Sequence, residues 1–294
     1  MTSSNWSVGK TAEPIKENLM QLASKDYRQF CLMACKVKFP HLKRQTGKFR
    51  FSDVHSYNYH EIKDRYNLTD EVNASLIDGS PEFIAMEYPT DHSLVSTAEL
   101  VLKSKTSVII SLIGIRYHWE SDFMREHHVL DQKMGLLEFL AWAQEQGFDT
   151  SQLSYSDLHT VFTEEDGNFV IEKYHEKDTP SQLVFRINCN TWKDKTPPTE
   201  NTLKVLDAVH TMGRTLTNTA SPTIVHCMAG IGRTGSFIFY AIFRQALLNH
   251  QIADESRMSA FIDLFLYLRS KRTWMIEAPS QLELLYRMFI VDHS

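Results

Sequence analysis

Residues 223–243, TIVHCMAGIGRTGSFIFYAIF, place a cysteine, an arginine and three glycines between two apolar stretches. The run before Cys227 is predicted to be a short buried strand, and the run from about Gly232 is predicted to be a buried helix. Both elements need apolar partners, so this segment requires a sheet with helices packed on its faces. We therefore expect an α/β (α+β) fold with a loop held between a strand and a helix N-terminus.

The rest of the chain reads as one domain, without internal repeats or a long linker. Expected helices cover residues 26–39, 91–105, 130–147 and about 202–219, and three more begin near Gly232, Glu255 and Ala278. Expected strands cover residues 106–114 and 181–192, with a hairpin over residues 158–175. This pattern favours a central mixed, twisted sheet flanked by helices. We assign the domain to residues 26–294, after a polar segment, residues 1–25, that is helical or disordered.

The composition restricts the functional class. The 294 residues are 43% hydrophobic and 23% charged, as in ordinary globular proteins. The net charge of −5 argues against a nucleic-acid partner bound through bulk charge. We find no run of roughly 20 apolar residues that would span a membrane and no signal-peptide core. The four cysteines lack zinc spacing, so we expect reduced thiols, no metal and a cytoplasmic location. The sequence does not determine the oligomeric state or the source organism. Delivery into a host cell by a pathogen or virus is an open alternative to the cytoplasmic location.

The glycine pattern around Arg233 has two interpretations that do not involve catalysis. Gly230, Gly232 and Gly235 fit the G-x-G-x-x-G pattern of dinucleotide-binding loops. That pattern lies late in this chain, however, and the next segment is helical where a parallel strand with an acidic end is required. Alternatively, Cys227 is a buried apolar residue and Arg233 a surface residue, but an arginine in the first turn opposes the helix dipole unless an anion meets it.

A phosphate-binding loop is the third interpretation, and it supplies that anion. A loop that enters a helix N-terminus directs backbone N–H groups at one point. Arg233 can hold two phosphate oxygens, and the same positive field stabilises a thiolate at Cys227. A thiolate below a phosphate is a nucleophile directed at phosphorus. His226 can fix the loop, and the Thr234 hydroxyl can donate a hydrogen bond to the departing sulfur.

HCMAGIGRTG, residues 226–235, resembles the HCxxGxxRTG signature of protein tyrosine phosphatases. The resemblance implies that Cys227 is the nucleophile and that Arg233 binds the phosphate. It also implies that the intervening loop surrounds the phosphate, and this loop consists of Met228, Ala229, Gly230, Ile231 and Gly232.

A general acid is also expected, because expulsion of a bare phenolate is costly near neutral pH. The family carries this acid in a W-P-D-x-x-x-P loop. Here Trp192, Lys193 and Asp194 are followed by Pro198 at the matching offset, so the resemblance assigns the acid to Asp194. Lys193 replaces the family's first proline, and we expect slower or less populated closure of this loop.

Further matches follow the family's order along the chain. KFRFSDV, residues 48–54, resembles the segment that walls the substrate ring, with Phe51 as the aromatic wall and Asp53 as the group that grips the substrate backbone. Residues 71–79 and 82–89 resemble the two segments that follow. Near the C-terminus Gln281 matches the second glutamine of the family's Q-T-x-x-Q, whereas Glu277 replaces the first, which positions the hydrolytic water. Residues 115–157 match poorly.

These matches predict hydrolysis of phosphotyrosine in proteins, without metal or cofactor, and a phosphotyrosine peptide as partner. The cysteine loop carries no lysine, unlike loops that bind phosphoinositides, and Phe51 with Asp53 disfavours a shallow dual-specificity cleft. An alternative is a binding module with little turnover, because Lys193 and Glu277 both alter catalytic helpers. The intact Cys227, Arg233 and Asp194 favour the enzyme.

Overall fold

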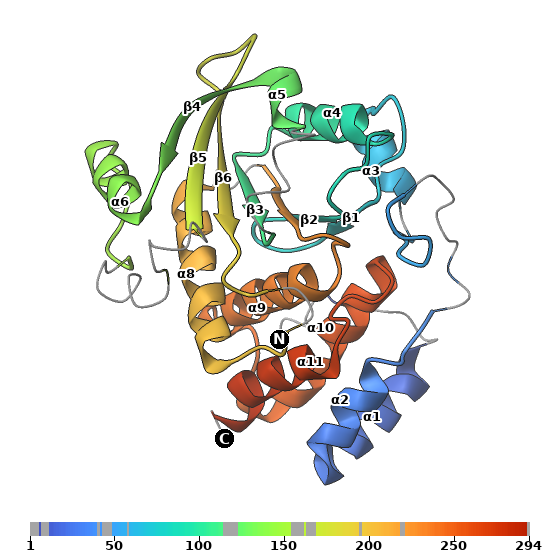
Figure 1. The fold of residues 1–294 in the computed structure, drawn as a ribbon. Coiled ribbons are helices and arrows are strands. Elements are labelled where there is room, and N and C mark those ends of the chain that lie inside the picture. Colours follow the sequence, from blue (N-terminus) through green and yellow to red (C-terminus); the bar gives the residue numbers. More distant parts are fainter. Residues whose placement is uncertain are drawn as a thin grey trace.

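The computed structural model describes residues 6, 12–39, 42, 49–57, 59–113, 123–153, 162, 169–193, 196–217 and 221–292. Their strands form one seven-stranded sheet in the order β1-β2-β7-β3-β6-β5-β4 (Figure 1). The strands are β1 (Ala74–Ile77), β2 (Phe83–Met86), β3 (Val108–Ser111), β4 (His128–Met134), β5 (Phe169–Glu176), β6 (Leu183–Cys189) and β7 (Thr223–His226).

Helices cover this sheet on both sides (Figure 1). The longer ones are α1 (Glu13–Lys25), α4 (Leu94–Ser104), α6 (Leu136–Glu145), α8 (Glu200–Leu216), α9 (Gly232–Leu248) and α10 (Arg257–Lys271). The shorter ones are α2 (Tyr27–Ala34), α3 (Tyr59–Tyr66), α5 (Met124–His127), α11 (Pro279–Tyr286), the 3₁₀ turn Asp254–Ser256 and the π-turn Arg287–Val291. Helices α8 and α9 pack directly on the parallel strands. The expected mixed sheet flanked by helices is confirmed.

The central strands explain where the site forms. Strands β2, β7, β3 and β6 run parallel, whereas β1, β5 and β4 are antiparallel to their neighbours. Strands β3 and β7 are buried along their whole length, as expected of parallel strands covered on both faces. Parallel strands end at one edge of the sheet, so the loops after β2, β6 and β7 emerge together there, which is where open α/β sheets bind ligands.

An aromatic cluster holds α9 against the C-terminal helices. The Phe239 and Phe261 ring centroids lie 4.7 Å apart, and those of Phe243 and Phe289 lie 4.8 Å apart. Such pairs stabilise by about 0.5–1.5 kcal/mol beyond the burial of their area. Helix α9, whose first turn carries Arg233, is thereby fixed relative to α10 and the π-turn Arg287–Val291.

One predicted helix is partly wrong. Residues 130–134 belong to β4, and the helix begins only at Leu136. The backbone of β4 pairs with β5 across a bulge between Leu130 and Gln132, a contact between distant segments that helical spacing cannot reveal. Extended Gly135 separates the two elements, and its N–H donates to Glu138 Oε2 at 3.0 Å. The predicted stop at Gly147 is confirmed, with φ of +77°.

Two other expectations concern segments that the structure describes only in part. A strand, β5, forms at the second arm of the expected hairpin, but it pairs with β4 on one edge and β6 on the other, so the hairpin predicted over residues 158–175 is wrong. Residues 158–161 lie outside the described residues. At the N-terminus, α1 contacts α10 through Lys16 Nζ, 2.7 Å from Asp263 Oδ1. The boundary between residues 25 and 26 stays a prediction.

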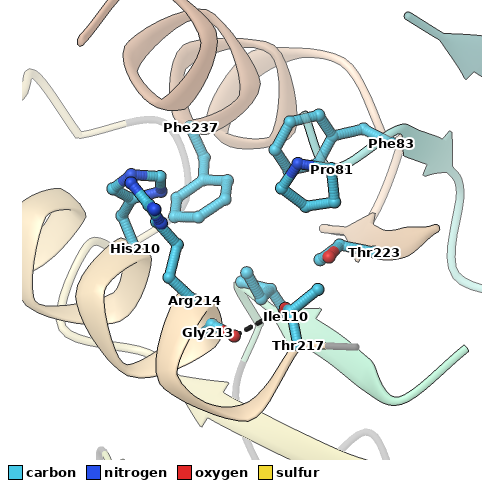
Figure 2. Close-up of a pocket in the computed structure, with 9 residues that line it drawn as sticks. All are labelled: Pro81, Phe83, Ile110, His210, Gly213, Arg214, Thr217, Thr223 and Phe237. Atoms are coloured by element: carbon cyan, nitrogen blue, oxygen red, sulfur yellow. Dashed lines mark hydrogen bonds between the residues drawn. The ribbon is translucent and has the colours of Figure 1, made fainter. Parts of the chain in front are cut away.

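A small cavity of about 10 Å³ lies where α8 and α9 meet β3 and β7 (Figure 2). His210 and Thr223 line it, and neither His210 Nε2 nor Thr223 Oγ1 has a hydrogen-bond partner in the described part of the chain. Burial, reinforced by Arg244 and Arg214, lowers the pKa of His210 to about 3. The imidazole is therefore neutral in the folded protein.

We expect His210→Phe to make the protein less sensitive to acid. An unfolded histidine binds a proton below about pH 6.5, whereas folded His210 does not until about pH 3, so falling pH favours unfolding across that window. Between pH 6.5 and 5 the wild type should lose about 2 kcal/mol relative to the variant in urea unfolding. The control is exposed His92→Phe, which should follow the wild type. Parallel curves for wild type and His210→Phe would contradict this assignment.

Candidate active site

The loop after β7, residues 227–232, is named the cysteine loop here, and its carbonyls are bound by the surrounding scaffold. Tyr88 N–H donates to Met228 O at 3.0 Å, and Ile276 N–H donates to Ile231 O at 3.2 Å. Arg272 donates to the two carbonyls between, with 2.9 Å to both Ala229 O and Gly230 O. The C=O and N–H of a trans peptide point in opposite directions. With the carbonyls bound outside, the amides of this loop are directed inward, where they can meet an anion.

Arg272 is fully buried and central to this arrangement. Burial lowers its pKa to about 10, against the opposing effect of Glu87, so the guanidinium is charged at neutral pH. It also donates to Asn73 Oδ1. Asn73 Nδ2 in turn donates to Val54 O at 2.9 Å and to Glu87 Oε2 at 3.1 Å. One buried network therefore connects the cysteine loop to the segment that holds residues 50–54.

Cys227 and Arg233 line one cleft of about 740 Å³. Both are nearly buried, at 4% and 5% exposure, at the N-terminus of the 17-residue helix α9. A helix N-terminus and a guanidinium both favour an anion beside the thiol. Arg233 Nη1 also donates to Trp192 O at 3.2 Å, which joins the cysteine loop to the segment after β6.

Most of the residues predicted for the site lie in this cleft. The lining includes Phe51, Asp53, Trp192, Cys227, Met228, Ala229, Ile231, Gly232, Arg233, Glu277 and Gln281. Gly230, His226 and Thr234 support the loop from behind instead of lining the cleft. Asp194 lies outside the described residues, although Lys193 and Thr196 on either side of it both line the cleft. The roles of all these residues stay predictions.

The supporting residues are deeply buried. His226 is 0% exposed, and its ring centroid lies 5.7 Å from that of Tyr88 and 6.2 Å from that of Phe123. Burial, with a contribution from Arg186, lowers the pKa of His226 to about 3, so it is a neutral packing residue under the loop. Thr234 is also 0% exposed, and its Oγ1 has no hydrogen-bond partner among the described residues.

The cleft wall that contains Phe51 and Asp53 is held in place by Arg50. Its backbone N–H donates to Glu87 Oε1 at 3.2 Å, and its guanidinium donates to Tyr88 O at 3.1 Å and Pro89 O at 2.7 Å. These bonds tie the segment with Phe51 and Asp53 to the end of β2. Trp192 is held by a hydrogen bond of its own, in which its Nε1–H donates to Thr196 O at 3.2 Å.

The third wall is the loop between α10 and α11. Arg269 Nη2 donates to Ile276 O at 3.1 Å and to Cys35 O at 3.0 Å, which ties this loop to the end of α2. Trp274 lines the cleft, and Lys38 Nζ lies 4.7 Å from its ring centroid. Sequence reasoning missed Trp274 and Arg272. No local sequence signal marks Trp274 as a cleft residue or Arg272 as buried, because both depend on contacts with distant segments.

Two classes of feature are absent from the described ranges. Among these residues no three His, Cys, Asp or Glu side chains gather in a way that could hold a metal ion. Within the same part of the chain, no helix has the length and apolar character needed to cross a bilayer.

Gly230 is where the cysteine loop touches the sheet most closely. Its φ is +69°, and a Cβ added there would stand 2.1 Å from Met86 O. We expect Gly230→Ala to lower the free energy of unfolding by at least about 3 kcal/mol, from backbone strain and overlap together. Gly135→Ala is the matched control, because a Cβ at Gly135 meets nothing within 4 Å. Equal stability of the two variants in chemical denaturation would show that the loop does not abut β2.

Comparison with known proteins identifies the family of this chain. Residues 45–291 match the family model for protein-tyrosine phosphatase. The human receptor-type tyrosine-protein phosphatase zeta is 24% identical over 80% of this chain, and the mouse tyrosine-protein phosphatase non-receptor type 2 is 23% identical over 86%. This chain spans only 10% and 58% of those two relatives.

Solved structures agree on the fold. The catalytic domain of human protein tyrosine phosphatase non-receptor type 18 superposes with a TM-score of 0.62 at 17% identity, covering 97% of this chain and 98% of that one. A Trypanosoma brucei protein tyrosine phosphatase gives a TM-score of 0.60 at 16% identity, covering 98% and 95%. The resemblance drawn from residues 226–235 is confirmed: the chain belongs to the protein-tyrosine phosphatase family.

Proposed function

We propose that this protein hydrolyses phosphotyrosine in proteins through a cysteinyl-phosphate intermediate. The observation that carries the proposal is the cysteine loop: its carbonyls are bound by Arg272, Tyr88 and Ile276, so its amides face the cleft that holds Cys227. Family membership supports the same reaction. One of the similar structures is that of a phosphatase, PTPN18, in complex with phosphopeptides of HER2.

In the first step the Cys227 thiolate attacks phosphorus in line with the leaving phenolate oxygen. The P–S bond forms as the P–O bond breaks, and Asp194 donates a proton to the phenolate. Arg233 and the loop amides bind the phosphoryl oxygens throughout, which is electrostatic stabilisation by groups already in place. Phe51 stacks on the phenyl ring, and Asp53 binds the peptide backbone beside it.

In the second step a water molecule attacks phosphorus and the Cys227 thiolate departs. The family resemblance gives the proton of that water to Asp194, which the first step leaves ionised. The Thr234 hydroxyl donates a hydrogen bond to the sulfur as it leaves. The cytoplasmic location expected from the sequence stays a prediction.

We expect Cys227→Ser to lower hydrolysis of p-nitrophenyl phosphate and of a phosphotyrosine peptide by about 10⁴-fold or more, because the thiolate nucleophile is lost. The wild type should prefer the phosphotyrosine peptide to a phosphoserine peptide and to a phosphoinositide. The measurement is phosphate release by purified protein, and peptide binding by Cys227→Ser serves as the folding control. A wild type that binds the peptide but releases no phosphate would favour the binding module instead.

A further inference from the structure

Two carboxylates of the described chain line the cleft, Asp53 on one wall and Glu277 on another. Glu277 lies against the cysteine loop: its Oε2 is 3.3 Å from the point where a Cβ on Gly232 would stand. Gln281 Nε2 is 3.0 Å from the same point. The two side chains therefore meet at Gly232, where the cysteine loop becomes α9, and both face the cleft that holds Cys227.

Glu277 and Gln281 differ in whether they donate or accept hydrogen bonds. Gln281 Oε1 accepts from Ala278 N–H at 3.1 Å, which leaves Nε2 as the donor of this amide; Nε2 and Oε1 stand 3.0 Å and 3.3 Å from the Cβ position at Gly232. An ionised Glu277 only accepts hydrogen bonds. A water molecule that meets both groups accepts from Gln281 and donates to Glu277. That arrangement orients a lone pair of the water oxygen and loosens one of its protons.

Arg269 is a buried positive charge that couples to Glu277. It is 2% exposed, and its Nε and Nη1 make no hydrogen bond within the described residues. Burial lowers the pKa of Arg269, whereas Cys35 acts most strongly to raise it and the charge of Glu277 adds a smaller effect in the same direction. Arg233, in the same cleft, adds a second positive charge and offsets the repulsion between a carboxylate and a phosphoryl group.

We propose that Glu277 is the general base that activates water for hydrolysis of the cysteinyl-phosphate. Water oxygen forms the new P–O bond, the P–S bond breaks, its electron pair returns to Cys227 as thiolate, and the water proton passes to Glu277. Gln281 holds the water by donation from Nε2. This role rests on the proposed function. It differs from the role of an amide at the same position, since a glutamine can orient water but cannot accept its proton.

In this proposal two different carboxyl groups carry out the two proton transfers. Asp194 protonates the leaving phenolate in the first step, and Glu277 accepts the proton in the second. The second step no longer depends on one residue that serves as acid and then as base.

Rapid-mixing kinetics with p-nitrophenyl phosphate distinguish the two steps, because the initial burst of p-nitrophenol reports thiolate attack and the slow phase reports hydrolysis of the cysteinyl-phosphate. Glu277→Gln should keep a burst of p-nitrophenol close to one equivalent of protein, because thiolate attack is untouched. The slow phase, and the rate of inorganic phosphate release, should fall by about 10²-fold or more, the usual contribution of a general base. The matched control is Glu283→Gln, the same substitution on α11 away from the cleft lining, which should behave as the wild type.

Chemical rescue provides a second readout that a structural role would not move. Added formate should accelerate phosphate release by Glu277→Ala and leave Glu283→Gln unaffected, because a small carboxylate can occupy the vacated space and accept the proton. Phosphate release by Glu277→Gln at or above the wild-type rate, with no rescue of Glu277→Ala, would overturn the assignment of the base and leave the phosphatase function intact. A wild type without any p-nitrophenol release would overturn both.

Discussion

The contact between Arg272 and the cysteine loop is the interaction on which the site depends. A buried guanidinium is costly unless its donors are satisfied, and here it donates to two consecutive loop carbonyls and to Asn73. Those bonds decide which way the loop's peptide units face. If the carbonyls faced the cleft, the same residues would repel a phosphate instead of binding it. Arg272, which does not line the cleft, thus orients the peptide groups of the loop that does.

The sheet brings the other parts to that loop. Strands β2, β6 and β7 end at one edge, so Tyr88, Trp192 and Cys227 meet although they are distant in sequence. Two hydrogen bonds join these loops: Tyr88 N–H donates to Met228 O, and Arg233 Nη1 donates to Trp192 O. The N-terminal helices participate as well, because Arg269 ties the end of α2 to the loop that precedes Glu277. Helix α2 therefore helps to position one wall of the cleft, although it precedes the region that matches the family model.

Parts of the fold and of the site were predictable from the sequence where the residues that determine them lie close together in the chain. The strand before Cys227 and the helix after it were predictable, since the two apolar runs and the glycines between them all lie within residues 223–243. Strand β4 was not, because its hydrogen bonds go to β5, and an amphipathic run of that length fits a helix equally well. The positions of Phe51, Asp53 and Glu277 in one cleft followed from the resemblance and not from periodicity. Arg272 and Trp274 were missed because burial and ring contacts depend on segments far apart in the chain.

In the proposed mechanism the sulfur of Cys227 is the atom that receives the phosphoryl group. The most direct test is acid quench of the protein within milliseconds of mixing with a phosphotyrosine peptide, followed by peptide mass spectrometry. We expect a phosphoryl group on the proteolytic fragment of this protein that contains Cys227. It should form before inorganic phosphate appears and be absent from Cys227→Ser. Release of phosphate at the same rate with no phosphorylated cysteine, or with the label on another residue, would contradict it.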